Sequence, residues 1–327
     1  MRGSGVHLDG VPVRVPTGRG RRGGAWGSLI AALSRPTLRI GVDLMLPPVL
    51  AVSLGLLVAA AFGAGDFAGG RASQSSSTPG VLLVSQISAG AIAVALAFSA
   101  DINGRDLTLG ACAGALNVVG LGLLYQALST GRMSLAAPVT AVVGAVVPIT
   151  WGLLQGERPS ALVLVGVGAA VAAGAMIGAT HSDATSGAGR RALLMAIAAG
   201  LGFGASFIFF AQTSGESGNW PVLAARTSAV VLVVTGVAVL ATRRTVQFPK
   251  GRDRLVALAA GALDVTATAL LLLAVRHGLI VVVAPVAALA PAMTVVLSWA
   301  LLKERIGRSQ LLGLAVALPA LVLIAAG

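Results

Sequence analysis

One carboxylate stands out because it lies inside an apolar segment long enough to span a membrane. Asp264 is about ten residues into the segment 255–275. A carboxylate at this depth costs at least about 2.5 kcal/mol on insertion scales, so it needs a partner, a cavity or a proton. The residue type and position therefore indicate binding of a substrate or a coupling proton. A helix–helix hydrogen bond that only holds the bundle together is the alternative.

Three further polar side chains lie within apolar segments. Asn117 is in the middle of the segment 107–128, and Gln86 is in the segment 80–100. Arg226 is near the start of the segment 221–242, where it could bind an anionic group, pair with an acid or extend to the interface. We expect these side chains to share a substrate- or proton-binding region with Asp264.

Two other candidates lie near segment ends. Asp66 is surrounded by glycines, which allow close backbone approach. It could contact substrate or act in a gate, or it could form an interfacial pair with Arg71. Tyr125 could line the cavity, although no spacing makes this specific.

Pro138 and Pro285 occupy the same early position of two apolar segments, 133–155 and 279–302. Proline removes a backbone hydrogen bond and kinks a helix. Equivalent kinks in two halves of a transporter often mark a binding or gating region. A static kink that fits the packing is the alternative.

These positions belong to a sequence that occurs twice. Residues 131–166 align without a gap to residues 278–313, 147 positions later, and the register extends back to position 114. About a third of the aligned positions are identical, and Asn117 falls on Asp264. In each copy a Glu-Arg pair follows the apolar segment, at Glu157 and again at Glu304, where we expect a structural capping or loop contact.

Ten apolar segments follow position 47, five in each copy, and most approach the roughly 20 residues that a spanning helix needs. The sequence predicts an all-α integral membrane protein. Its domains are a tail at 1–46, a first repeat at 47–180, a linker at 181–190 and a second repeat at 191–327. Because five is odd, the second repeat must enter the membrane from the opposite side, so the repeats are inverted.

Composition supports this fold class. The chain is 56% apolar and only 10% charged, whereas soluble domains average about 25% charged residues. The net charge of +12 comes from the N-terminal tail and from loops, so it does not indicate nucleic-acid binding. The tail, residues 1–46, is expected to be disordered, or to precede a true start at Met45; a basic segment lying on anionic lipid is the other reading.

The repeated AP…GER and AP…KER motifs resemble the EamA family of the drug/metabolite transporter superfamily, from about position 47 to the C-terminus. FGAGDF at 62–67 and FGASF at 203–207 are similar to the family's WG-x-x-x-F signature, with Phe in place of Trp. Arg226 fits a position where the family often has Arg, and Gln86 lies near that position in the first half. The resemblance implies ten helices, secondary transport and cytoplasmic termini.

The loop charges disagree with the last implication. Loops opposite the termini carry more Arg and Lys than loops on the terminal side, and basic loops usually remain inside the cell. With the basic tail included, the two sides are nearly balanced. The orientation of the termini therefore stays open between the two expectations.

We expect a permease that moves a small organic metabolite or drug across the cell membrane by alternating access, as an exporter, with protons as a candidate coupling ion. Its partners would be the small-molecule substrate and the lipid bilayer. No phosphate-binding loop or metal-ligand spacing is present, so no cofactor or metal is expected and no enzyme activity. A membrane scaffold or lipid-handling protein, with the same polar groups bonded to one another in a dry interior, is the alternative.

Overall fold

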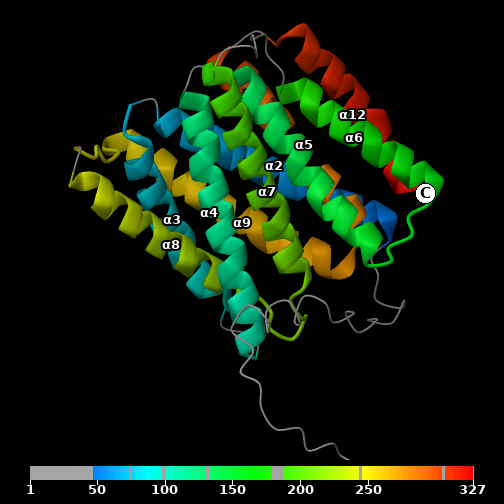
Figure 1. The fold of residues 1–327 in the computed structure, drawn as a ribbon, viewed down its shortest axis with the longest axis horizontal. Helices are drawn as coiled ribbons and strands as arrows, with labels where there is room; N and C mark the ends of the chain where they lie inside the picture. Colours follow the sequence, from blue (N-terminus) through cyan, green and yellow to red (C-terminus); the bar gives the residue numbers. More distant parts are fainter. Residues whose placement is uncertain are drawn as a thin grey trace, which may run out of the picture. The chain divides into compact units, whose positions relative to one another are not determined.

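The computed structural model describes residues 47–73, 75–97, 101–129, 133–178, 187–242, 245–303 and 306–326, which form helices and short connections (Figure 1). The tail 1–46 and most of the linker lie outside the described residues. In chain order the helices are α2 (Pro48–Ala72), α3 (Thr78–Ala97), α4 (Gly104–Ser129), α5 (Met133–Leu154), α6 (Ala161–Gly178), α7 (Gly187–Ala211), α8 (Trp220–Ala241), α9 (Gly251–His277), α10 (Ile280–Ala287), α11 (Ala290–Leu302) and α12 (Arg308–Ala326).

These helices match the predicted apolar segments. Among the described residues, 8 helices are long and apolar enough to cross a membrane, with α10 and α11 counted together. α5 and α6 contain shorter apolar helices. Within hydrocarbon a helix satisfies its own backbone groups, which is why these sequences are helical. The chain is an integral, multi-pass membrane protein, as predicted.

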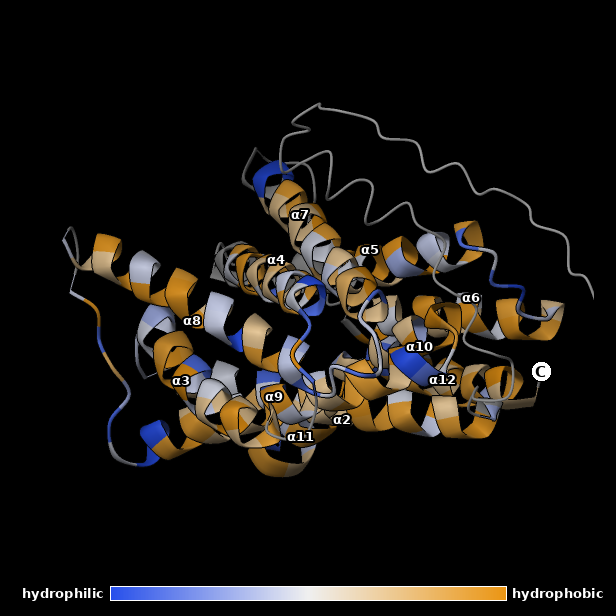
Figure 2. Cartoon of the chain, turned by 90° about the horizontal axis from the view of Figure 1, so that it is seen from below, coloured by the Kyte–Doolittle hydropathy of each residue, from blue (hydrophilic) through white to orange (hydrophobic). Residues whose placement is uncertain are grey.

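The outer surface is apolar. Large side chains such as Val165, Leu318 and Val322 are 62%, 69% and 66% exposed, although they would be buried in a soluble protein of this size. Figure 2 shows hydrophobic colour along the helices and hydrophilic colour mainly near their ends and connections. This pattern places the lipid against the sides of the bundle.

The helices pack as a bundle whose two edges are helix pairs. α3 and α8 lie side by side at one edge, and α6 and α12 lie side by side at the other (Figure 1). Between these edges α2 packs on α9, α4 packs on α7 and α8, and α5 packs on α7. The short α10 contacts α2, α5, α6 and α9, and all eight of its residues are buried.

Successive antiparallel helices leave their connections at two ends of the bundle. One end carries the connections into α4, between α5 and α6, between α7 and α8, and between α9 and α10. The other end carries the α2–α3, α8–α9 and α11–α12 connections. Ser77 and Gln247, from two of these, are joined by hydrogen bonds of 2.7 and 3.0 Å.

The ninth apolar segment is broken where its mate is continuous. α10 ends at Ala287 and α11 begins at Ala290, with Pro285 inside α10 and Pro291 in the first turn of α11. Pro291 has no N–H to continue the ladder, whereas a proline is well tolerated in the first turn of a new helix. α5 runs from Met133 to Leu154 without interruption. The sequence predicted kinks at Pro138 and Pro285; the interruption lies between Ala287 and Ala290, so those kinks stay a prediction.

Candidate functional site

A cavity of about 750 Å³ lies within the bundle and contains most of the predicted polar site residues. Asp66, Gln86, Asn117 and Asp264 all line it. The remaining wall comes mainly from apolar and aromatic side chains of α2, α5, α7, α10 and α11. The structure therefore brings together residues from segments that are far apart in the sequence.

The cavity extends toward one end of the bundle only. Its outer wall includes Arg71, Ser73, Leu302, Ile306 and Gln310, which lie near the α2–α3 and α11–α12 connections. No lining residue comes from the connections at the other end, among the residues that the structure describes. We call the first the open end and the second the closed end.

At the base of the cavity Asp264 is paired with Arg226. A guanidinium N–H of Arg226 donates to Asp264 Oδ2, and the side chains of Arg226 and Asp264 are 3% and 23% exposed, respectively. The same guanidinium donates to Gln86 Oε1 at 3.3 Å and to Thr268 Oγ1 at 2.5 Å. Arg226 therefore does not extend to the interface; it holds the inner wall of the cavity and neutralises Asp264.

Asp66 faces the same cavity but makes no hydrogen bond or ion pair with another described residue. It comes next to Gly65, where an added Cβ would lie 3.3 Å from Ala260 O and 3.6 Å from Asp264 N. The missing side chain lets α2 approach α9 closely, and this brings Asp66 beside the Arg226–Asp264 pair. The predicted interfacial pair with Arg71 is not formed, and Asp66 is exposed to the cavity.

Of the other candidates, the structure describes the side chains of Asn117 and Pro285 only. Asn117 lines the cavity from α4, and Pro285 is buried in α10, which contributes Ala284 and Ala287 to the wall. The side chains of Tyr125 and Pro138 lie outside the described ones.

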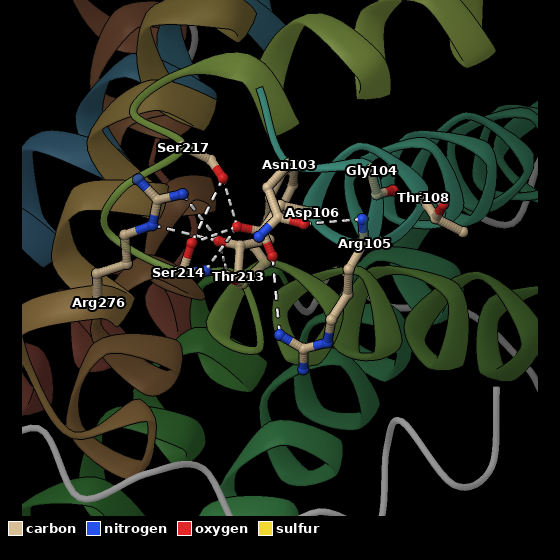
Figure 3. Close-up of polar contacts among 10 residues, drawn as sticks. Asn103, Gly104, Arg105, Asp106, Thr108, Thr213, Ser214, Ser217 and Arg276 are labelled. Carbon is tan, nitrogen blue, oxygen red and sulfur yellow. Dashed lines mark hydrogen bonds and ion pairs between the residues drawn. The ribbon is translucent and has the colours of Figure 1, made fainter. Parts of the chain in front are cut away.

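The closed end is held by a polar cluster that the sequence reasoning missed (Figure 3). Asp106, in the first turn of α4, is fully buried, and its Oδ2 accepts from Ser214 N at 3.0 Å and from Ser214 Oγ and Ser217 Oγ at 2.5 Å each. From the last turn of α9, Arg276 donates to Thr213 Oγ1 at 3.0 and 3.2 Å and to Gly218 O at 2.7 Å. The cluster ties α4 and α9 to the α7–α8 connection.

A signal for this cluster was present in the repeat. Arg105-Asp106 lies 147 positions before Arg252-Asp253, in the register of the duplication. Asp253 starts α9 at the open end, and its Oδ2 accepts from Ser75 Oγ at 2.5 Å in the α2–α3 connection. Asp106 and Asp253, which are 147 positions apart, thus contact the α7–α8 and the α2–α3 connections, respectively.

Glu157 adds a second tie at the closed end. Its Oε1 and Oε2 accept from the backbone N–H of Ile280 and Val281, each at 3.0 Å, and so cap the first turn of α10. Burial raises the pKa of the Glu157 carboxyl above its ordinary value, and the two amide bonds only partly oppose this. Arg158 donates to Leu153 O at 3.2 Å in the last turn of α5, as predicted for a residue near helix-terminal carbonyls.

Comparisons with known proteins agree with the fold. Residues 190–326 match the EamA-like transporter family. Solved structures match in 23 chains; one of them, titled "Crystal structure of protein", has a TM-score of 0.67 and 13% identity, covering 85% of this chain and 98% of that chain. At this identity the likeness shows the fold alone. A comparison with curated proteins gives no match.

Proposed function

Residues 190–326 belong to the EamA-like transporter family, within the drug/metabolite transporter superfamily, and we propose that the chain is a secondary transporter working by alternating access. The observation that carries the proposal is the cavity, which holds polar groups at membrane depth and reaches one end of the bundle only. A dry scaffold would have no such opening. The cargo is a small organic metabolite or drug.

Alternating access by inverted repeats requires that the halves be related by a twofold rotation. Packing between α6 and α12 supports this. A Cβ on Gly166 would meet Ala320 O at 2.9 Å, and a Cβ on Gly313 would meet Ala173 O at 2.8 Å. Both pairs are the same contact with the halves exchanged, in the 147-residue register. Early residues of each helix meet late residues of the other, so the two equivalent helices run antiparallel.

Contacts at the other edge repeat the pattern. A Cβ on Gly114 would lie 2.0 Å from Ala225 O, and a Cβ on its mate Gly261 would lie 2.0 Å from Ser85 O. Likewise Ser228 Oγ donates to Ala111 O at 2.8 Å, and Ser88 Oγ donates to Leu258 O at 2.9 Å. In these contacts α3 and α8 are related by a register of 140 residues.

The same register makes Gln86 the mate of Arg226, as Asn117 is the mate of Asp264. The four polar groups at membrane depth are therefore two equivalent pairs around one axis, charged in the second half and neutral in the first. A site on the axis that relates the two halves can open to either end, because exchanging the conformations of the halves reverses the open end. This supports its role as the substrate site.

The closed-end contacts indicate which elements move. Glu157 and Arg276 hold the α9–α10 hairpin, and Asp106 binds the α7–α8 connection that Arg276 also binds. We propose that release of this hairpin opens the closed end, while the equivalent α4–α5 hairpin closes the open end.

Transport can be tested without knowing the cargo. We expect cells expressing the protein to change the medium-to-cell ratio of one class of metabolites relative to cells with an empty vector. Asp264→Ala should abolish the change, because it removes the counter-ion of Arg226. Asp101→Ala, at an exposed position outside the cavity, is the control. An unchanged metabolite profile with correctly inserted protein would reject transport, and the direction of the ratio distinguishes export from import.

Orientation follows from a fusion at the C-terminus. The chain is proposed to lie in the cell membrane with both termini in the cytoplasm, so the closed end faces the cytoplasm. A fluorescent protein that matures only in the cytoplasm should be bright when fused after Gly327. Activity of a fused periplasmic phosphatase instead would support the orientation favoured by the loop charges.

A further inference from the structure

We propose that the cavity binds a monovalent organic cation, in which an amine or quaternary ammonium group is joined to an aromatic or branched apolar body, and that the Asp66 carboxylate is its counter-ion. The inference rests on the proposed function and deepens it by naming the class of substrate. It follows from the charges that line the cavity, from the bonds that they already make, and from the composition of the wall.

Among the residues that the structure describes, one negatively charged side chain in the cavity is left without a compensating partner. The described charged side chains that line the cavity are Asp66, Arg71 and Asp264. Asp264 is neutralised by Arg226, which lies behind the wall and is 3% exposed. Arg71 is exposed near the mouth, where water and salt weaken its field. Deeper in the cavity, Asp66 is the described charged side chain that remains without a compensating charge.

Asp66 is held where a ligand can reach it. Its carboxylate faces the cavity without a hydrogen bond to another described residue, beside the close contact of Gly65 with α9. An ionised carboxylate away from bulk water is unfavourable unless a positive charge or hydrogen-bond donors meet it. A cationic ligand supplies the positive charge, and a protonated amine also supplies N–H donors.

At the depth of Asp66, the described residues offer an anionic ligand no equivalent partner. The guanidinium of Arg226 already donates to Asp264, Gln86 and Thr268, and it is buried. A carboxylate or phosphate placed in the cavity would meet the field of Asp66 instead. The arrangement therefore favours cations over anions of the same size.

The wall suits a cation that carries an apolar body. Aromatic side chains line the cavity together with Asp66: Phe62, Phe67, Phe203, Phe207 and Trp299. Aromatic faces attract ammonium groups, and quaternary ammonium ligands are often held in this way. The volume of about 750 Å³ is within the range of pockets that enclose small organic ligands.

The test compares three probes with the same phenylethyl body and different charge. Purified full-length protein in lipid nanodiscs is titrated calorimetrically with phenylethyltrimethylammonium, 3-phenylpropionate and 2-phenylethanol. We expect the cation to bind at least about tenfold more tightly than the other two, because interactions with a charged group contribute this much or more. Equal or tighter binding of the anion would overturn the proposal.

Variants assign the effect to Asp66. Asp66→Asn should weaken binding of the cation at least about tenfold and leave the neutral probe unchanged. Asp101→Asn removes one negative charge outside the cavity and should keep the wild-type affinity. Unchanged cation affinity in Asp66→Asn would overturn the proposal.

If Asp66→Asn does not insert, Asp66→Glu retains the charge and should retain the preference for the cation; loss of that preference would count against the proposal. Binding is measured at equilibrium without a gradient. A failure of transport with intact cation binding would therefore reject the proposed function alone, and transport of an anion would reject only this inference.

Discussion

Arg226 and Asp264 compensate each other at membrane depth, so the loss of either leaves the other unpaired. Removing one partner of a buried pair costs about 3–5 kcal/mol. We expect Arg226→Gln and Asp264→Asn each to lower the unfolding temperature in nanodiscs. The double variant should recover much of the loss, because it has the uncharged types found at the equivalent Gln86 and Asn117. A double variant whose loss equals the sum of the two single losses would contradict the pairing.

Glu157 should make stability depend on pH in a defined direction. Its folded pKa is raised, so the folded protein binds the proton more tightly than the unfolded chain does. The contribution is fully present below the ordinary pKa of glutamate and is lost as the pH rises through the raised value. The unfolding temperature of the wild type should therefore fall relative to Glu157→Gln as the pH rises across this window.

Glu216→Gln, at an exposed position of the same end, is the control for loss of one charge. A wild-type unfolding temperature that rises relative to Glu157→Gln over that range would contradict the assignment.

Single residues also show where sequence reasoning stops. Asp264, Asn117, Arg226 and Gln86 were selected because polarity inside an apolar segment is expensive, and all four lie at or beside the cavity. Pairing with an acid was one of the alternatives for Arg226, but the choice of Asp264 as partner depends on how α3, α8 and α9 pack. Asp106 was missed because it lies at a helix start, where an acid is ordinary.

At the scale of elements, close contacts between helices depend on glycines that are 147 positions apart in the sequence. Gly114→Ala and Gly261→Ala would each place a Cβ 2.0 Å from a carbonyl oxygen of the neighbouring helix. Overpacking of this kind costs about 1–3 kcal/mol. We expect both variants to lower the unfolding temperature by similar amounts, because the contacts are equivalent.

Gly122→Ala, in the same helix as Gly114, meets nothing within 4 Å and serves as the control. It should leave stability unchanged or raise it slightly, since alanine favours helix. Destabilisation by only one of the two equivalent variants would contradict the proposed relation between the halves.

The helix boundaries were predicted closely, because long apolar runs leave few alternatives in a membrane. The break between α10 and α11 was not. Both equivalent segments contain two prolines, and the sequence gives no reason why Pro291 interrupts one helix while Pro148 is accommodated in the other. Neighbouring helices decide this, since they supply or withhold partners for the freed carbonyl groups.

At the scale of the whole molecule, the duplication predicted a polar region enclosed by two halves, and the structure contains a cavity at that depth. The sequence could not predict which end the cavity reaches, because the two halves permit both. In the structure the end that is closed is the one that carries the hydrogen bonds of Asp106, Glu157 and Arg276. The repeat does not require the forms open at one end and at the other to have equal free energy. A substrate would shift the equilibrium between these two forms according to the difference between its affinities for them.

The central claim is that the two ends open in alternation, and paired distance measurements test it most directly. In a Cys112→Ala background, spin labels are placed at Ser76 and Lys303 across the open end, and in a second protein at Gln155 and Glu216 across the closed end. Substitution of Arg276 removes bonds that hold the α9–α10 hairpin, so it should shift the equilibrium toward the form in which the closed end opens. We predict that Arg276→Ala lengthens the closed-end distance and shortens the open-end distance. Distances that stay fixed, or that change in the same direction at both ends, would contradict the account.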